Sequence, residues 1–199
     1  MNFTEKHLQE VKQIVSNLDS VKIENLVAAL KKIKLSKGRL FFLGVGGSAG
    51  NCSHAVNDFR KIIGIESYAP TDNVSELTAR TNDEGWNSIF VEWLKTSQIN
   101  ENDAIFIFSV GGGNFEKNIS ANLISAIDLA KKKNAKVFSI VGKPDGYAAT
   151  NSDYCIVIPI VNNDSITPHS EAFQSVIWHL LVSHPDLKEN ETKWEQITK

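Results

Sequence analysis

Two glycine-rich segments of the chain have the composition of anion-binding turns. The first glycine loop reads Gly44-Val45-Gly46-Gly47-Ser48, and the second glycine loop reads Ser109-Val110-Gly111-Gly112-Gly113-Asn114. Each follows a short apolar run and precedes a stretch with helical spacing. Glycine lets a backbone approach a ligand without a Cβ in the way, and the start of a helix offers free N–H groups and the positive end of a dipole. Together, the two loops predict a site for a phosphate-sized anion.

Two other interpretations of the first glycine loop are open at this point. The spacing Gly44-x-Gly46-x-x-x-Gly50 resembles a dinucleotide-binding fingerprint, and Glu66 lies about twenty residues further on, where a ribose-binding acid is sought. Glu66 falls at the start of the second predicted strand, however, so its side chain would lie at the wrong edge of the sheet. The remaining alternative is a turn in which glycine meets only a steric need.

Two pairs of polar residues have spacings that could place them together on helices. His54 and Asp58 are one helical turn apart and can face the same side. Glu171 and His179 lie on the last predicted helix, where an eight-residue interval spans about 12 Å with an angular offset of about 80°. Spacing alone favours a solvated pair at His54 and Asp58 and a core histidine at His179.

The composition predicts one globular domain that binds neither nucleic acid nor a membrane. Hydrophobic residues make up 42% of the 199 residues, which is enough for a core, and the formal net charge is −2. Basic residues are interleaved with acidic ones, so no basic patch indicates nucleic-acid binding. No apolar stretch is long enough to span a bilayer, and the first residues lack the apolar region of a signal peptide, so we expect a cytoplasmic protein.

The cysteines agree with that expectation. Cys52 and Cys155 are the only two and form no Cys-x-x-Cys pair, which fits a reducing compartment and argues against a thiolate zinc site. Cys52 is near a predicted helix start, where a thiol can be activated. A small residue packed in the core is the favoured interpretation.

The apolar pattern alternates between strand and helix after an N-terminal pair of helices. Residues 1–36 have helical spacing with a break at Asp19 and Ser20, which predicts two antiparallel helices. The predicted strands are Leu40–Leu43, Ser67–Ala69, Ala104–Phe108, Val137–Val141 and Cys155–Ile158. The predicted helices are Ala49–Ile63, a segment from Val74 to about Asn82, Trp86–Thr96, Phe115–Lys133 and Pro168–Ser183, the last with Thr167 as its N-cap.

This alternation predicts an α/β fold, a flavodoxin-like three-layer sandwich with a five-stranded parallel sheet. Within one domain of residues 1–199, residues 1–36 form the helical pair, residues 37–184 the α/β core and residues 185–199 a solvated tail. In the flavodoxin-like strand order, ligands bind where the chain reverses between its first and third strands, beyond their carboxyl ends. Both glycine loops are expected at that place.

The motifs taken together resemble the sugar isomerase (SIS) domain family. The resemblance is carried by Gly46-Gly47-Ser48 with His54, by Asn82-Asp83-x-Gly85, by Ser109, and by a C-terminal helix with Glu171 and His179. Within the family, the chain is most similar to phosphoheptose isomerases, which convert sedoheptulose 7-phosphate into D-glycero-D-manno-heptose 7-phosphate. The resemblance implies an aldose-ketose isomerase, a sugar phosphate as its small-molecule partner, and a homotetramer with active sites shared between subunits.

The resemblance also implies roles for individual residues. Asp58 and His179 would be catalytic, moving a proton between adjacent carbons through an enediol. Two histidines and two carboxylates, His54, Asp58, Glu171 and His179, would hold zinc or another divalent metal. Substrate-binding residues would be Val45, Gly46, Gly47, Ser48, Asn82, Asp83, Ser109, Val110, Gly111, Gly112, Gly113, Asn114 and Glu171. For Asn82 and Asp83, a turn or helix end before Gly85 is an equal alternative.

The chain departs from the family pattern at three places. Val45 stands where the family has a substrate-contacting asparagine, and Asp58 is one methylene shorter than the family's glutamate. The family's second loop reads Ser-Thr-Ser-Gly-Asn-Ser, so most of its phosphate-binding hydroxyls are missing here. Ser109, Asn114 and the backbone N–H groups of residues 111–114 could still form an anion-binding nest. These losses keep a second hypothesis open, a non-catalytic sugar-phosphate sensor or protein-binding module.

Overall fold

The computed structural model describes residues 1–198 and has a five-stranded parallel sheet at its centre. The strand order is β2-β1-β3-β4-β5, and every neighbouring pair is parallel. The strands are β1 (Leu40–Leu43), β2 (Ser67–Tyr68), β3 (Ala104–Ser109), β4 (Lys136–Val141) and β5 (Tyr154–Val157). All residues of β1 and β3 are buried, as expected for strands covered on both faces. The predicted flavodoxin-like fold and its strand order are confirmed.

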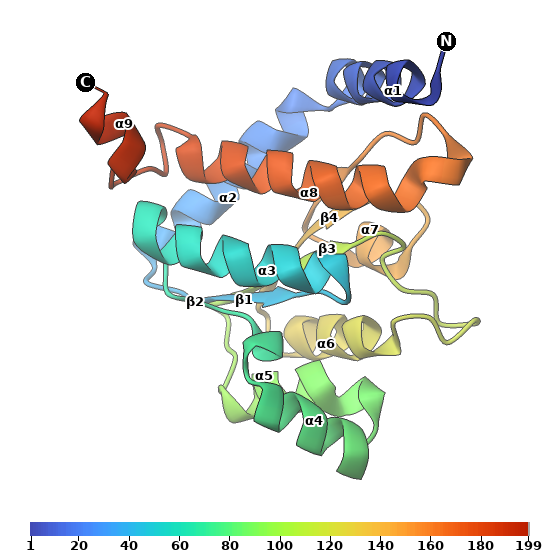
Figure 1. The fold of residues 1–199 in the computed structure, drawn as a ribbon. Helices are drawn as coiled ribbons and strands as arrows, with labels where there is room; N and C mark the ends of the chain where they lie inside the picture. Colours follow the sequence, from blue (N-terminus) through green and yellow to red (C-terminus); the bar gives the residue numbers. More distant parts are fainter. Residues whose placement is uncertain (199) are drawn as a thin grey trace.

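Helices cover the sheet on both faces, which gives three layers (Figure 1). On one face, α2, α3 and α8 pack on Phe42, Phe106 and Phe138. On the other face, α5, α6 and α7 pack on Phe41 and Ile105. The helices are α1 (Phe3–Asn17), α2 (Ser20–Leu35), α3 (Gly47–Asp58), α4 (Val74–Asp83), α5 (Ile89–Thr96), α6 (Ala121–Lys132), α7 (Tyr147–Asn151), α8 (Ile166–Ser183) and α9 (Lys193–Ile197).

The two N-terminal helices are present, but they do not form the predicted antiparallel pair. Helix α2 leads on from α1 in Figure 1 and does not fold back along it, and α2 packs against β5. Helix α1 lies along α8 at the top of Figure 1, and its buried residues are Glu10 and Ile14. Periodicity identifies the apolar face of a helix but not the element that covers it, which is why the arrangement was predicted wrongly.

Several predicted helix boundaries differ from the structure. Helix α8 begins at Ile166 after Ser165, so Thr167 is not its N-cap. Helix α6 begins at Ala121, because residues 114–120 form a loop in which Asn114 and Ile119 pair as an isolated antiparallel bridge. Helix α3 ends at Asp58 and continues as a π-helical turn, Phe59–Ile63, that stops at Gly64 with φ of 79°. The apolar pattern does not show the local hydrogen bonds that determine where a helix begins and ends, so predicted ends differ by a few residues.

Buried polar and thiol groups complete the core. Asp103 is buried at the amino edge of the sheet, where its carboxylate accepts hydrogen bonds from the Arg39 backbone N–H (2.9 Å) and from Arg39 Nη2 (2.7 Å). The bond to Asp103 raises the pKa of Arg39. Cys52 is fully buried, and burial raises the pKa of its thiol well above the ordinary value, which confirms the packing interpretation. Residues 1–198 contain no helix with the length and apolarity needed to cross a membrane.

Candidate active site

The first glycine loop forms the start of α3. Gly46 is the N-cap of α3 with φ of 64°, no side chain caps the helix, and an added Cβ at Gly46 would meet nothing within 4 Å. Gly44 has the opposite environment, because a Cβ there would lie 2.7 Å from the Ser48 carbonyl oxygen. The first N–H groups of a helix have no partner inside it. The loop therefore presents free donors at an exposed, sterically open helix start.

Glu171 lies directly against this loop. A Cβ added to Gly47 would lie 2.7 Å from Glu171 Oε1, so the glycine leaves the space that this carboxylate occupies at the start of α3. Ser170, the preceding residue, makes a similarly close approach to Gly142 after β4. The first turns of α8 therefore cover the carboxyl edge of the sheet and form one wall of the candidate site.

The second glycine loop is largely engaged in bonds within the chain. Ser109 Oγ accepts from the Gly112 N–H at 3.0 Å, and the Asn114 N–H donates to the Ile119 carbonyl at 2.9 Å. The carbonyls of Gly112 and Gly113 accept from the first N–H groups of α7 at 2.8 and 2.9 Å. Gly112 has φ of 71° and lies close to α7, which explains the glycine there. Two of the four N–H groups expected to form a nest are thus already used.

Both loops leave the same edge of the sheet, from neighbouring strands. Strands β1 and β3 pair in parallel with Leu43 opposite Ile107, so residues 44–48 and 109–114 both follow the carboxyl ends. The reversal of strand order lies between these two strands. The structure therefore places both loops at the point where ligands bind in open parallel sheets.

A cluster of two histidines and one carboxylate lies further along α3 and α8. The Nε2 atoms of His54 and His179 are each 3.9 Å from Asp58 Oδ2, and the two rings meet edge to face at 5.4 Å. The side chains of His54 and His179 are 59% and 49% exposed, whereas that of Asp58 is 14% exposed. We call these three residues the open cluster, because solvent or a ligand can reach the imidazoles.

Hydrogen bonds fix how the open cluster presents its nitrogen and oxygen atoms. His179 Nδ1 lies 2.7 Å from the Ser175 carbonyl oxygen and donates to it, which leaves Nε2 as the nitrogen on the Asp58 side. Asp58 Oδ1 accepts a hydrogen bond from Asn57 at 2.7 Å, which leaves Oδ2 for the histidines. The arrangement can move a proton or accept a cation.

The donor set of the open cluster fits a divalent metal with three protein ligands. One ligand atom from each of His54, Asp58 and His179 lies within 4.8 Å of the others, and two imidazoles with one carboxylate suit zinc. Glu171, the fourth predicted ligand, is outside this group. Glu171 lies about two turns before His179 on α8, and its carboxylate is beside Gly47 and not beside the histidines.

Asn51 sets the relative position of α3 and α8, and sequence reasoning missed it. Its Nδ2 donates to the Glu171 carbonyl at 2.9 Å and to Gln174 Oε1 at 3.0 Å, while its Oδ1 accepts from Ser175 Oγ at 2.6 Å. Asparagine is a poor helix former, so its presence inside a predicted helix is the signal that could have indicated a specific contact. The network holds His54 opposite His179.

Asn82 and Asp83 are in a different layer from these groups. They are the last residues of α4, which lies on the α5 side of the sheet in Figure 1, and both are exposed. Asn82 Nδ2 donates to Asp83 Oδ1 at 2.7 Å, and Gly85 follows with φ of 87°. Within one subunit, Asn82 and Asp83 therefore form a helix end before Gly85, which was the alternative to substrate binding.

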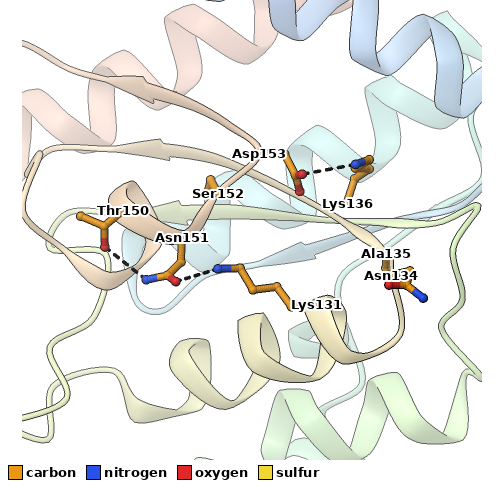
Figure 2. A pocket seen from close by; sticks show the side chains of 8 residues that line it. All are labelled: Lys131, Asn134, Ala135, Lys136, Thr150, Asn151, Ser152 and Asp153. Atoms are coloured by element: carbon orange, nitrogen blue, oxygen red, sulfur yellow. Dashed lines mark hydrogen bonds and ion pairs between the residues drawn. The ribbon is translucent and has the colours of Figure 1, made fainter.

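A polar hollow of about 390 Å³ lies at the opposite edge of the sheet, where β4 and β5 begin (Figure 2). In it, Lys131 donates to Asn151 Oδ1 at 2.6 Å and Lys136 pairs with Asp153 at 3.3 Å. These cations already have partners, and the hollow is at the amino ends of the strands, where parallel sheets do not build ligand sites. It contributes nothing to the candidate site.

Comparison with known proteins assigns the chain to a family. The family profile described as SIS domain matches residues 2–142, which is most of the chain. The protein belongs to the SIS domain family. This agrees with the resemblance of its motifs, with the five-stranded parallel sheet and with the position of both glycine loops.

Curated relatives of this SIS domain protein include biosynthetic proteins and isomerases. It is 31% identical over 158 residues to the lincomycin biosynthesis protein LmbN of Streptomyces lincolnensis, covering 74% of this chain and 56% of that protein. It is 27% identical over 164 residues to a phosphoheptose isomerase of Aneurinibacillus thermoaerophilus, covering 80% of this chain and 77% of that protein. The chain thus spans little more than half of the former and about three quarters of the latter.

Solved structures confirm the fold. The phosphoheptose isomerase GmhA from Neisseria gonorrhoeae superposes with a TM-score of 0.74 at 19% identity, covering 90% of this chain and 92% of that one. A phosphoheptose isomerase from Francisella tularensis gives 0.71 at 20% identity, covering 92% of this chain and 97% of that one.

Proposed function

We propose that this protein is an aldose-ketose isomerase acting on a sugar phosphate, most closely of the phosphoheptose isomerase type. The proposed reaction converts sedoheptulose 7-phosphate into D-glycero-D-manno-heptose 7-phosphate. The observation that carries the proposal is the open cluster: Asp58 lies 3.9 Å from two exposed imidazoles on the same pair of helices that carries the first glycine loop. Phosphoheptose isomerases among the relatives and the similar structures support the substrate class.

The substrate's phosphate would be held at the carboxyl edge of the sheet. The uncapped N–H groups at the start of α3 attract an anion, and Ser48, Ser109 and the remaining N–H groups of the second loop are close in the fold. Glu171 would repel a phosphate placed directly on Gly47. We therefore assign Glu171 to a sugar hydroxyl, where a carboxylate is a strong hydrogen-bond acceptor.

Proton transfer is assigned to Asp58 and His179. Isomerisation moves a proton from one carbon to its neighbour through an enediol, so one group accepts the proton and another handles charge on oxygen. His179 can act at Nε2, because its Nδ1 is held by the Ser175 carbonyl. Phosphate binding would register the sugar chain against these groups. Asn82 and Asp83 would contact substrate only if a neighbouring subunit brings α4 to the site.

A divalent metal is compatible with the same residues. His54, Asp58 and His179 would hold the ion, and zinc is the proposed species because the donors are two nitrogens and one oxygen. With the ion bound, His179 Nε2 would be a ligand and not a proton carrier. Such an ion polarises a carbonyl or an enediol oxygen. The protein would supply the orientation, since Asn51 fixes the α3 to α8 register.

Assembly into a homotetramer is the proposed quaternary state. Exposed apolar side chains on α1, Phe3, Leu8 and Val15, and on α8, Val176 and Leu180, offer surfaces that a second copy could cover. An interface at α8 would adjoin the open cluster on that helix, which fits sites shared between subunits. We propose a cytoplasmic location, because both cysteines are free thiols, as is usual in a reducing compartment.

A second candidate function is a non-catalytic sugar-phosphate sensor. The observation that favours it is the second glycine loop, whose Ser109 hydroxyl and two of whose N–H groups are bound within the chain. With fewer donors in that loop, a ligand would be held less precisely for chemistry, and a sensor would need ligand binding but not the open cluster.

The experiment that separates the two is turnover of sedoheptulose 7-phosphate by purified protein, with and without added zinc. The isomerase proposal predicts product that is lost in Asp58→Asn and in His179→Gln, with phosphate-dependent binding retained in both. Tight binding without product would favour the sensor, and undiminished turnover in both variants would contradict the assigned roles.

A further inference from the structure

A second histidine-carboxylate group joins α1 to the start of α8, outside the open cluster. His169 Nε2 lies 2.8 Å from Glu10 Oε2, and the His7 ring stacks on the His169 ring at 4.6 Å with an angle of 25°. One ligand atom from each residue lies within 4.8 Å of the other two. His169 and Glu10 are buried and His7 is half-buried. We call these three residues the closed cluster.

The spacing of the closed cluster is that of a helical metal site. His7 and Glu10 are three residues apart on α1 and therefore share one face, while His169 comes from a separate helix. Paired carboxylate and histidine ligands at this interval, completed by residues of a facing helix, are a recurrent way of building metal sites between helices. Two imidazole nitrogens and one carboxylate oxygen match the preferences of zinc and its divalent neighbours.

Neighbouring side chains already orient the Glu10 carboxylate. Asn162 Nδ2 donates to Glu10 Oε1 at 2.8 Å, which directs Oε2 toward His169. Lys6 is 3.9 Å from Glu10 Oε1 and its side chain is 62% exposed, so it can turn toward solvent when a cation arrives. A ligating carboxylate held by a second hydrogen bond is what metal sites usually show.

The rearrangement needed for binding is small. Tetrahedral zinc with ligands at about 2.0–2.1 Å separates two donor atoms by about 3.3 Å, so the 2.8 Å contact between Glu10 and His169 would open by about half an ångström. The His7 side chain would also rotate to leave its stacked position. His7 has that freedom because it is half-buried near the start of α1.

We propose that His7, Glu10 and His169 form a binding site for a zinc-class divalent metal ion, which fastens α1 to α8. The ligands come from two helices, and α1 has only Glu10 and Ile14 as buried residues, so ion binding and docking of α1 are coupled. The site is distinct from the open cluster and does not depend on the proposed isomerase activity.

The test measures zinc binding by tag-free protein in a background in which the open cluster is disabled, His54→Gln with Asp58→Asn. Titration calorimetry with zinc alone is expected to show one remaining ion per chain. Adding His7→Gln is expected to weaken that binding at least tenfold, because a ligand is lost while the buried Glu10 to His169 contact stays. The matched control is His184→Gln, a histidine whose Nε2 lies 3.4 Å from Glu24 and which lies outside both clusters.

A second measurement reads the docking of α1 directly. In the same background, zinc is expected to raise the unfolding temperature and to slow hydrogen exchange of the α1 amides, and His7→Gln is expected to abolish both effects. Absence of zinc binding in the background variant would overturn the proposal, as would equal zinc affinity with and without His7. Neither result would change turnover by the protein with an intact open cluster. A failure of the zinc-site proposal is therefore distinguishable from a failure of the proposed function.

Discussion

Two histidine-carboxylate clusters on α8 are built from the same residue types but differ in access. In the open cluster, Asp58 is 3.9 Å from each of two half-exposed imidazoles. In the closed cluster, Glu10 and His169 are buried and in contact at 2.8 Å, and the hydrogen bond from His169 lowers the pKa of Glu10. Wide spacing and exposure leave room for a substrate, whereas contact and burial fasten helices together. Access, more than residue type, therefore separates a site for chemistry from a site that organises the fold.

Asp58→Asn should give the largest effect and should affect activity rather than stability. It removes the carboxylate between the two imidazoles, and loss of a general acid-base group typically costs about 10²–10⁴-fold in rate. The side chain is 14% exposed, and an asparagine oxygen can still accept the hydrogen bond from Asn57, so the unfolding temperature should change little. Steady-state kinetics with thermal melts measures both, and an inactive protein that is also strongly destabilised would contradict the comparison.

Glu10→Gln should show the reverse pattern, with lower stability and retained chemistry. A glutamine keeps the shape but removes the charge that faces His169, and it weakens the hydrogen bond that Asn162 donates. We expect the free energy of unfolding to fall by about 1–3 kcal/mol. Urea unfolding measures the loss. If Glu10→Gln instead abolishes turnover in a fully folded protein, the division between the two clusters is wrong.

Gly47→Ala and Gly50→Ala form a matched pair on α3. A Cβ at Gly47 pushes against the Glu171 carboxylate, so KM for the sugar phosphate should rise about tenfold, the equivalent of one hydrogen bond. A Cβ at Gly50 meets nothing within 4 Å, and alanine in a helix interior should stabilise the fold by about 0.5–1 kcal/mol. Kinetics and melts of both variants check this, and equal KM values would remove Glu171 from the substrate site.

The smallest expected effect is the labelling of Cys52, which tests how firmly the buried face of α3 is packed. Burial raises the pKa of its thiol well above the ordinary value, so the thiolate should be absent at pH 8 and alkylation by iodoacetamide should require unfolding. Mass spectrometry of peptides labelled with and without denaturant measures this. Rapid labelling of Cys52 in the native protein would mean that α3 is loosely held and that the open cluster is not preorganised.

Much of the framework could be predicted from the sequence because it depends on local patterns. Apolar runs identified the strands, and glycines after β1 and β3 located both loops at the carboxyl edge. His54 and Asp58 were paired correctly because one helical turn is a fixed distance.

The remaining features depend on packing between distant elements. The family resemblance grouped Glu171 with His179, yet the register set by Asn51 places it against Gly47. The partners Glu10 and His169 are 159 residues apart, and no spacing rule connects them. The start of α6 was misplaced because the bridge between Asn114 and Ile119 competes with helix, which the composition of that segment does not reveal.

The most direct measurement of the central claim is isomerisation of sedoheptulose 7-phosphate in deuterated water, followed by NMR of the sugar phosphate. Proton transfer through an enediol at the open cluster predicts product that carries deuterium at C2, formed by the wild-type protein and absent with Asp58→Asn. Product without deuterium would point to transfer shielded from solvent or to hydride movement. Ligand binding with neither product nor exchange would contradict the assignment of this site to isomerase chemistry.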